Sequence, residues 1–213
     1  MTDHEQLPKP GFVLDTKLVK RFVADELDED GQAVLADQVA IIAMFHAELP
    51  NALAAQMTRI LQHLGGEAEL VRWLDRFPGR PKIVARLFAL IDLLDTFSAE
   101  PSVVTALSEL RADTRYPPGL SGYLSPDTDD ETLGGLAWHI EQLAADDRMA
   151  DAVRLAQNSA ALVEQLAARA RELNPDLPDL ADLAAKAGKA VDDAANEAAA
   201  RQSEGSPSWH RPR

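Results

Sequence analysis

The sequence predicts an all-α protein, a compact multi-helix bundle followed by an Ala-rich helical hairpin or extension. Three observations predict this class. Apolar residues recur with the 3.6-residue period of amphipathic helices, and the two-residue alternation of half-buried strands is almost absent. Glycine and proline pairs divide the periodic stretches into segments of helical length. Hydrophobic residues make up 46% of the 213 residues, which is enough to bury a core.

Local chemistry sets the ends of several predicted helices. Gly65–Gly66 ends the third helix, Pro78–Gly79 follows the fourth, and Glu100–Pro101 separates the fifth from the sixth. Asn174–Pro175 closes the long eighth helix. The nine predicted helices span residues 15–27, 32–48, 51–64, 67–77, 82–97, 102–112, 129–147, 149–173 and 178–201.

The composition changes near residue 145. All six Phe and both Tyr lie before it, whereas twenty of the 36 Ala lie after residue 143. Large side chains supply most of the buried area and fix a unique core, so we expect the core in the first part. The predicted organisation is a flexible N-terminus (1–10), a helical core (11–147), an Ala-rich helical pair (148–202) and a disordered tail (203–213).

The Ala-rich pair carries small residues at alternating spacings of four and three. This 3.5-residue repeat lets helices approach closely but buries little apolar surface per turn. Two interpretations remain open: the pair folds back on the core as a hairpin turned at NPDLPDL, or its last helix pairs with another subunit or a partner protein. The seam of the last helix consists of Leu180, Ala184, Ala187, Val191 and Ala194.

Charge and cysteine counts limit the function classes. A net charge of −14 repels phosphate backbones, so we expect no direct nucleic-acid binding. The chain has no cysteine, which excludes thiolate metal sites and cysteine nucleophiles. No apolar run is long enough to span a bilayer, and the N-terminus lacks the apolar region of a secretory signal. We therefore expect no membrane insertion and a cytoplasmic location.

Five cations are concentrated in fifteen residues around the motif FPGRPK. Arg80 and Lys82 flank Pro81, the predicted start of a helix, where the helix dipole favours acids. Backbone N–H groups between two cations suit a carboxylate or phosphate, which predicts a site for an anion or a partner. Alternatively, acids of the chain itself, such as those in 25–30 or 127–131, neutralise the cations. The cations are Arg72, Arg76, Arg80, Lys82 and Arg86.

The connection 111–127 is long for a compact helical domain. It carries Arg115, Tyr116, Leu120 and Tyr123 together with three prolines. Long ordered loops are often functional, and Arg115 and the tyrosines would extend the basic site if they approached it. The alternative is a compact loop that fills a gap between helices with its own side chains.

Other motifs favour structure over chemistry. The segment 125–135 resembles a calcium loop only at its first positions, because the turn glycine and the closing glutamate are missing. Thr128 and Glu131 instead form a predicted capping box. Gly134–Gly135 inside the following helix suggests that something packs closely there, and His139, beside Trp138, is the histidine with the most notable surroundings. We predict no metal site, cofactor or catalytic residue.

These features favour a non-catalytic accessory or scaffold protein that acts through a protein partner or as a homo-oligomer. The first alternative is a protein that binds a small anionic ligand or substrate at 76–86. The second is an acidic nucleic-acid mimic, because a chain of net charge −14 could imitate a phosphate backbone.

Overall fold

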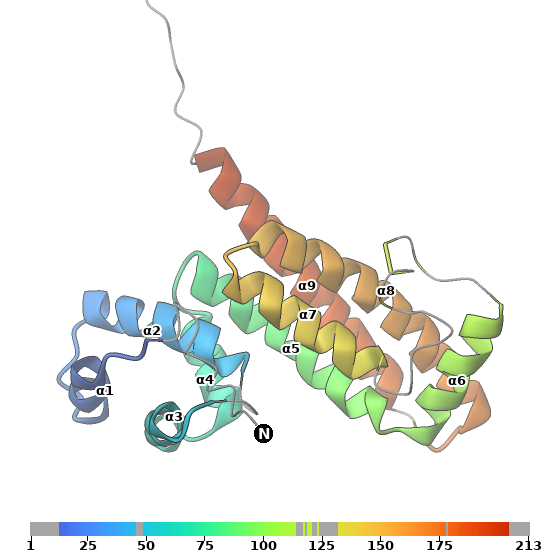
Figure 1. The fold of residues 1–213 in the computed structure, drawn as a ribbon, viewed down its shortest axis with the longest axis horizontal. Helices are drawn as coiled ribbons and strands as arrows, with labels where there is room; N and C mark the ends of the chain where they lie inside the picture. The colour runs from blue at the N-terminus through green and yellow to red at the C-terminus, as the bar shows by residue number, and fades with distance from the viewer. Residues whose placement is uncertain are drawn as a thin grey trace, which may run out of the picture. The chain divides into compact units, whose positions relative to one another are not determined.

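A computed structural model describes residues 13–45, 49–113, 117, 119–120, 123, 132–177 and 179–204. These residues form nine helices and no strand, which confirms the predicted all-α class (Figure 1). The predicted ranges of the third and eighth helices agree with the structure, and the others differ at one or both ends. The helices are α1 (Thr16–Val23), α2 (Glu29–Ala43), α3 (Asn51–Leu64), α4 (Glu67–Leu74), α5 (Arg80–Ser98), α6 (Pro101–Ala112), α7 (Thr132–Ala145), α8 (Met149–Leu173) and α9 (Asp179–Glu204).

The chain divides into two compact units, Met1–Pro81 and Lys82–Arg213, and the division lies in the first turn of α5. The first unit contains α1 to α4. The second contains nearly all of α5 together with α6 to α9. The change in composition near residue 145 therefore does not coincide with the division. The predicted N-terminus 1–10 and the tail from residue 205 lie outside the described residues.

Side-chain caps begin several helices and explain why one predicted start was wrong. The Asp28 carboxylate accepts a hydrogen bond from the Gly31 backbone N–H at 3.0 Å, so α2 begins at Glu29 rather than at residue 32. Gly31 occupies the first turn of this capped helix. Asp15 caps α1 in the same way through the Lys17 N–H at 2.7 Å.

An aromatic cluster forms the centre of the first unit. The Phe22 ring lies 5.0 Å from the Trp73 ring, which lies 5.4 Å from the Phe77 ring, and all three side chains are buried. The Trp73 indole N–H donates to the Gln32 side-chain oxygen at 3.4 Å. The Trp73 and Phe77 rings meet edge to face and the Phe22 and Trp73 rings meet at a tilt, and such ring contacts add to the stabilisation from burial. Together with the hydrogen bond from Trp73 to Gln32, they join α1, α2 and α4.

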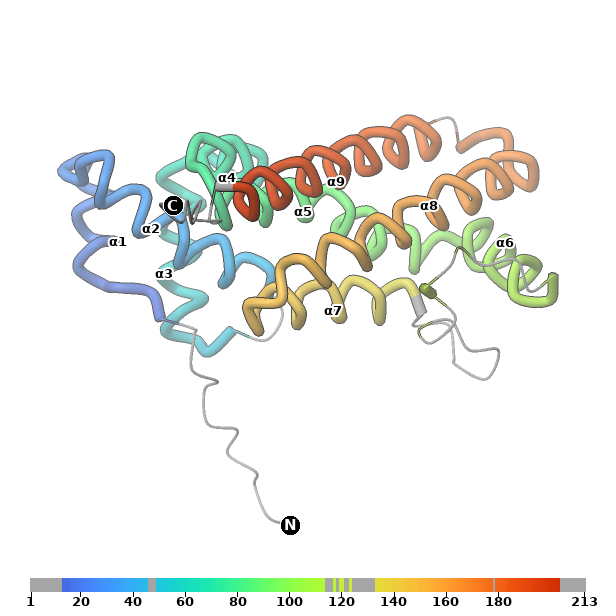
Figure 2. Tube along the Cα trace, turned by 90° about the horizontal axis from the view of Figure 1, so that it is seen from above, coloured from blue at the N-terminus to red at the C-terminus, as the bar shows by residue number. Residues whose placement is uncertain are grey.

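Helix α8 organises the second unit. It packs against α9, α7 and α6, and α8 and α9 run antiparallel and side by side in the ribbon of Figure 1 and the tube of Figure 2. A charged contact links α6 to α8, since the Arg169 guanidinium donates from Nε to Glu109 Oε2 on α6 and from Nη1 to Glu172 Oε2 on its own helix, each at 2.6 Å. The hydrogen bond to Glu109 raises the pKa of Arg169. The Ala-rich pair is therefore a helical hairpin that packs on other helices of the same chain.

The connection between α6 and α7 is docked at the positions that the structure describes. Leu120 is fully buried, and Gly119 has a φ of +91°, a conformation that glycine adopts without steric cost. A Cβ on Gly119 would lie 2.5 Å from Asn158 Nδ2, so the backbone comes very close to α8. These contacts favour the interpretation of a compact loop that fills a gap between helices.

Within the described ranges, none of the helices combines the length and the apolar character needed to cross a bilayer.

Candidate functional site

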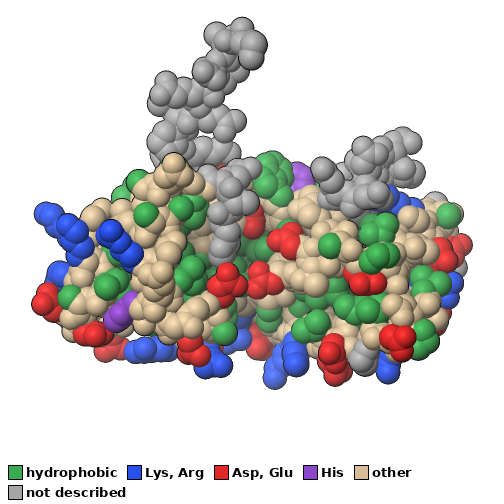
Figure 3. Space-filling model, turned by 90° about the horizontal axis from the view of Figure 1, so that it is seen from below, with side chains coloured by type: hydrophobic (Ala, Val, Ile, Leu, Met, Phe, Trp, Pro, Cys, Tyr) green, Lys and Arg blue, Asp and Glu red, His purple; other side chains and the backbone are tan. Residues whose placement is uncertain are grey.

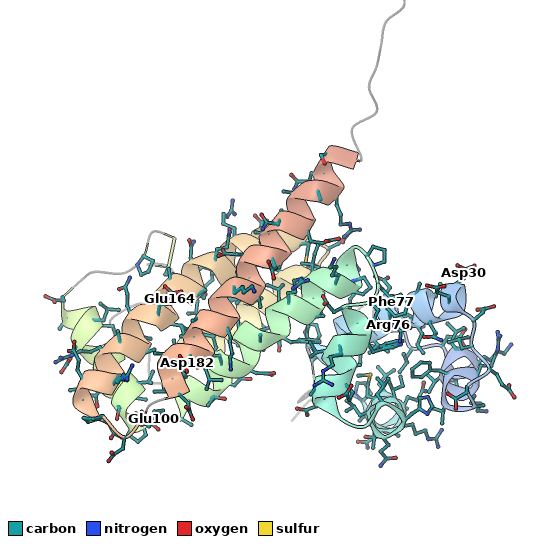
Figure 4. All side chains as sticks on the ribbon, turned by 180° about the vertical axis from the view of Figure 1, so that it is seen from behind. Asp30, Arg76, Phe77, Glu100, Glu164 and Asp182 are labelled. Carbon is teal, nitrogen blue, oxygen red and sulfur yellow. The ribbon has the colours of Figure 1, made fainter. Side chains whose placement is uncertain are left out.

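The predicted basic site is spread over the end of α4 and the start of α5. Arg76 is exposed in the turn after α4 (Figure 4), and Arg80 is the half-buried first residue of α5. Both belong to the first unit. Lys82 and Arg86 belong to the second unit, and they lie four residues apart on one face of α5.

Acids of α9 pair with the two cations of the second unit. Lys82 Nζ lies 3.4 Å from Glu197 Oε2, and Arg86 Nη1 donates to Asp193 Oδ2 at 3.1 Å. All four side chains are partly buried, with exposed fractions between 22% and 41%. Of the two cations that flank Pro81, Lys82 is therefore paired with an acid of its own unit, and Arg86, one turn further along α5, is paired in the same way.

The spacing of the pairs follows from helix geometry. The two cations are four residues apart on α5, and the two acids are four residues apart on the neighbouring α9, which runs antiparallel to it (Figures 1 and 2). Residues at this spacing share one helix face, so two matched pairs form along one contact. These acids are not the ones the sequence suggested, which lay in 25–30 and 127–131.

A double-mutant cycle on Arg86 and Asp193 should give a small coupling energy. Because both groups are partly exposed, we expect about 0.5–1 kcal/mol from urea unfolding of the wild type, Arg86→Ala, Asp193→Ala and the double variant. The coupling should decrease as salt is added. A coupling of zero at low salt would show that the pair does not fix α9 to α5.

The predicted partner seam of α9 is buried within the second unit. Val191 and Ala194 are 0% exposed, and Ala184 and Ala187 are 2% exposed. Leu180 is also buried, at 8%. Close approach to α8 occurs at Gly188, where a Cβ would lie 3.1 Å from Glu164 Oε1. The small residues thus pack α9 against other helices of its own chain. A partner protein that binds the folded unit therefore contacts other surfaces of it.

A second cluster lies on α7, and it includes one predicted site residue. The Tyr123 and His139 rings are 4.9 Å apart in an edge-to-face arrangement, and Trp138 meets His139 in the same way, also at 4.9 Å. Trp138 is 47% exposed, an unusual position for the largest apolar side chain. The other residues predicted from this loop, Arg115 and Tyr116, lie outside the described residues.

The face of α7 that carries Trp138 also carries two glycines. The inward face of α7 is marked by three buried residues, Leu133, Leu136 and Ile140. Gly134 and Gly135 lie about one turn before Trp138, on the opposite, outward face of the helix. No heavy atom of the described residues comes within 4 Å of a Cβ built on either glycine, apart from immediate neighbours and the helix backbone. The close packing expected at these glycines is therefore absent among the described parts of the chain.

The histidines and acids form no metal centre in the described part of the chain, where no group of three or more such residues could hold an ion. His63 Nε2 lies 3.3 Å from Asp25 Oδ1 and its ring packs on Phe22, which is a structural environment. His46 and the predicted capping box at Thr128 and Glu131 fall outside the described residues.

Sequence reasoning identified Gly134, Gly135 and His139 as unusual and named Trp138 only as the neighbour of His139, and it did not join Trp138 and the glycines into one surface. Their spacing was the available signal, because residues three and four apart share a helix face. A comparison with protein-family models, with curated proteins and with solved structures finds no match to this chain.

Proposed function

We propose that this chain is a non-catalytic accessory or scaffold protein that works through protein contacts, and that the outward face of α7 makes the main contact. We define this face by Gly134, Gly135 and Trp138. The observation that carries the proposal is the 47% exposure of Trp138 on a helix whose inward face is buried. Tryptophan is strongly enriched among the residues that dominate binding energy at protein interfaces.

The ring contacts around Trp138 support this proposal. His139 and Tyr123 hold the aromatic cluster together by edge-to-face packing, so the indole is supported before a partner arrives. A pre-ordered anchor loses less conformational entropy on binding than a freely rotating side chain. The cluster therefore suits recognition by a partner protein better than a role in the core.

The two alternative functions have less support. An anion at the basic site would have to displace Glu197 from Lys82 or Asp193 from Arg86, and each separation leaves a partly buried charge without its counterion. A nucleic-acid mimic needs a continuous acidic surface, whereas acidic and basic side chains are interspersed on the face in Figure 3. We therefore rank the anion-binding protein and the nucleic-acid mimic below a function through protein contacts.

The proposed function predicts that Trp138→Ala abolishes complex formation while the fold persists. Tagged wild-type chain, expressed in the cells that encode it, should co-purify with a partner or self-associate, and light scattering should report the mass of the complex. We expect at least a tenfold loss of captured partner for Trp138→Ala, because truncating a hot-spot residue removes most of its contact energy.

The matched control is Leu183→Ala, which removes another exposed apolar side chain, 42% exposed, from α9. This variant should behave as the wild type does. A wild-type protein that stays monomeric with and without lysate contradicts the proposed function, and so does equal capture by Trp138→Ala.

A further inference from the structure

The outward face of α1 carries three cations, and the helix contains no acid. Lys17, Lys20 and Arg21 are all exposed, and their spacings of three and four residues place them on one face. The buried Val19 and Phe22 mark the opposite face. Within the described ranges, none of these three cations forms an ion pair with a carboxylate. The positive charge of this face is therefore open to a counterion.

The outward face of the next helix, α2, carries the opposite charge. Asp30 and Asp37 are exposed and seven residues apart, so they share one face (Asp30 in Figure 4), and the fully buried Leu35 marks the inward face. In the part of the chain that the structure describes, neither carboxylate takes part in an ion pair. Glu26 and Glu29 are also exposed and add to the negative charge at the start of this helix.

These two faces are neighbours because α2 turns back along α1. The Asp15 backbone N–H, at the start of α1, donates to Gln38 Oε1 on α2 at 2.9 Å. Val34 lies one turn before Gln38, on the side of α2 that is next to α1, and it is 52% exposed. We call this area the hairpin surface, and it consists of Lys17, Lys20, Arg21, Asp30, Val34 and Asp37.

Helix dipoles explain only part of this charge pattern. Cations in the last turn of α1 and acids in the first turn of α2 complement the dipoles of their own helices. Lys17, however, lies in the first turn of α1, where the dipole disfavours a cation. Asp37 lies in the middle of α2, where the dipole has little effect. The hairpin surface therefore holds charges that local helix chemistry does not account for.

We propose that the hairpin surface binds the same surface of a second copy of the chain. A two-fold axis near Val34 brings the positive half of each copy onto the negative half of the other, so the surface is complementary to itself. The two Val34 side chains then pack at the centre, with the charged pairs around them. The net charge of −14 opposes this association weakly, because charges outside the contact are screened beyond about 8–10 Å at physiological salt.

Charge reversal followed by mixing tests the dimer with the full-length chain. Sedimentation should show a wild-type dimer with a dissociation constant of roughly 1–100 μM, because the interface is small. Lys17→Glu/Lys20→Glu places acids in the positive half, and Asp30→Lys/Asp37→Lys places cations in the negative half. Each variant alone should associate at least tenfold more weakly, since like charges meet across the axis. An equimolar mixture should form a heterodimer within about threefold of the wild-type affinity, because each altered half meets its complement.

The matched control is Lys186→Glu/Lys189→Glu, which makes the same change in net charge at two exposed lysines of α9. This variant should dimerise as the wild type does. Circular dichroism checks that every variant is folded. If a charge reversal unfolds the chain, Lys17→Gln/Lys20→Gln removes the same charges without reversing them and should weaken the dimer at least threefold.

Three results would overturn the hairpin dimer. They are a wild-type chain that is still monomeric at about 1 mM, charge variants that associate as the wild type does, and a mixture that forms no heterodimer.

The variant Trp138→Ala separates this inference from the proposed function, which uses a different surface. Its dimer should be as stable as that of the wild type. A dimer that is lost in Trp138→Ala belongs to the α7 face, which overturns the hairpin dimer and supports the proposed function. Conversely, failure of the hairpin dimer leaves the capture of a partner through Trp138 unchanged.

Discussion

Leu120→Ala should lower the free energy of unfolding by about 2–5 kcal/mol, although residue 120 lies in a connection rather than in a helix. Leu120 is fully buried, and its truncation removes apolar contacts and leaves a cavity at the docked loop. Urea unfolding followed by circular dichroism measures this change.

Leu183→Ala is the matched control for this substitution, because Leu183 is 42% exposed and should contribute about 0.5 kcal/mol or less. A loss below about 1 kcal/mol for Leu120→Ala would mean that the loop is not docked, since truncations of fully buried leucine typically cost more. The interpretation of the connection as a compact structural loop would then be wrong.

Val191→Asp should lower the free energy of unfolding by about 3 kcal/mol or more, because it places an unpaired carboxylate at a position with no exposure to water. Val191 lies in the middle of the seam by which α9 packs within the second unit. If α9 instead detaches so that water solvates the carboxylate, the loss in the free energy of unfolding equals the free energy with which α9 packs on the unit. Urea unfolding followed by circular dichroism measures this loss.

Ala185→Asp controls for the added negative charge and for the lower helix propensity of aspartate. Ala185 is exposed on the same helix, so its substitution should cost less than about 1 kcal/mol. Equal small effects at both positions would show that the seam faces solvent and is open to a partner helix, as one sequence interpretation proposed.

The helices were predictable because their signals are local. The 3.6-residue period gave the nine segments, and chain breakers such as Gly65–Gly66 gave several ends. The start of α2 was placed three residues too late, because the capping residue Asp28 was not recognised in the sequence. The division at Pro81 and Lys82 could not be predicted from composition, because it depends on which helices contact one another.

The candidate sites were predictable only in part. The sequence identified Lys82 and Arg86 as cations that need partners, but Asp193 and Glu197 are more than 100 residues away and could be assigned only after the α5 and α9 neighbours were known. The available clue was the spacing of four residues, both between Lys82 and Arg86 and between Asp193 and Glu197, because residues at this spacing share one helix face. Likewise, Gly134 and Trp138 were each noted in the sequence, but only the structure shows that the face of α7 they share is turned away from the core.

The double variant Gly134→Ala/Gly135→Ala tests the central claim, which is that the outward face of α7 serves a partner rather than the fold. Alanine is favoured over glycine by up to about 1 kcal/mol per helical position, and no described side chain obstructs either Cβ. We therefore expect the free energy of unfolding to rise by about 1–2 kcal/mol. At the same time, the amount of partner captured by the tagged chain should fall at least tenfold because close approach is blocked.

Urea unfolding of the double variant and capture of the partner by the same variant give both quantities. A gain in stability together with a loss of binding is the predicted result. A loss of stability, or unchanged binding, would contradict the claim, because the glycines would then serve the fold itself or no close contact at all.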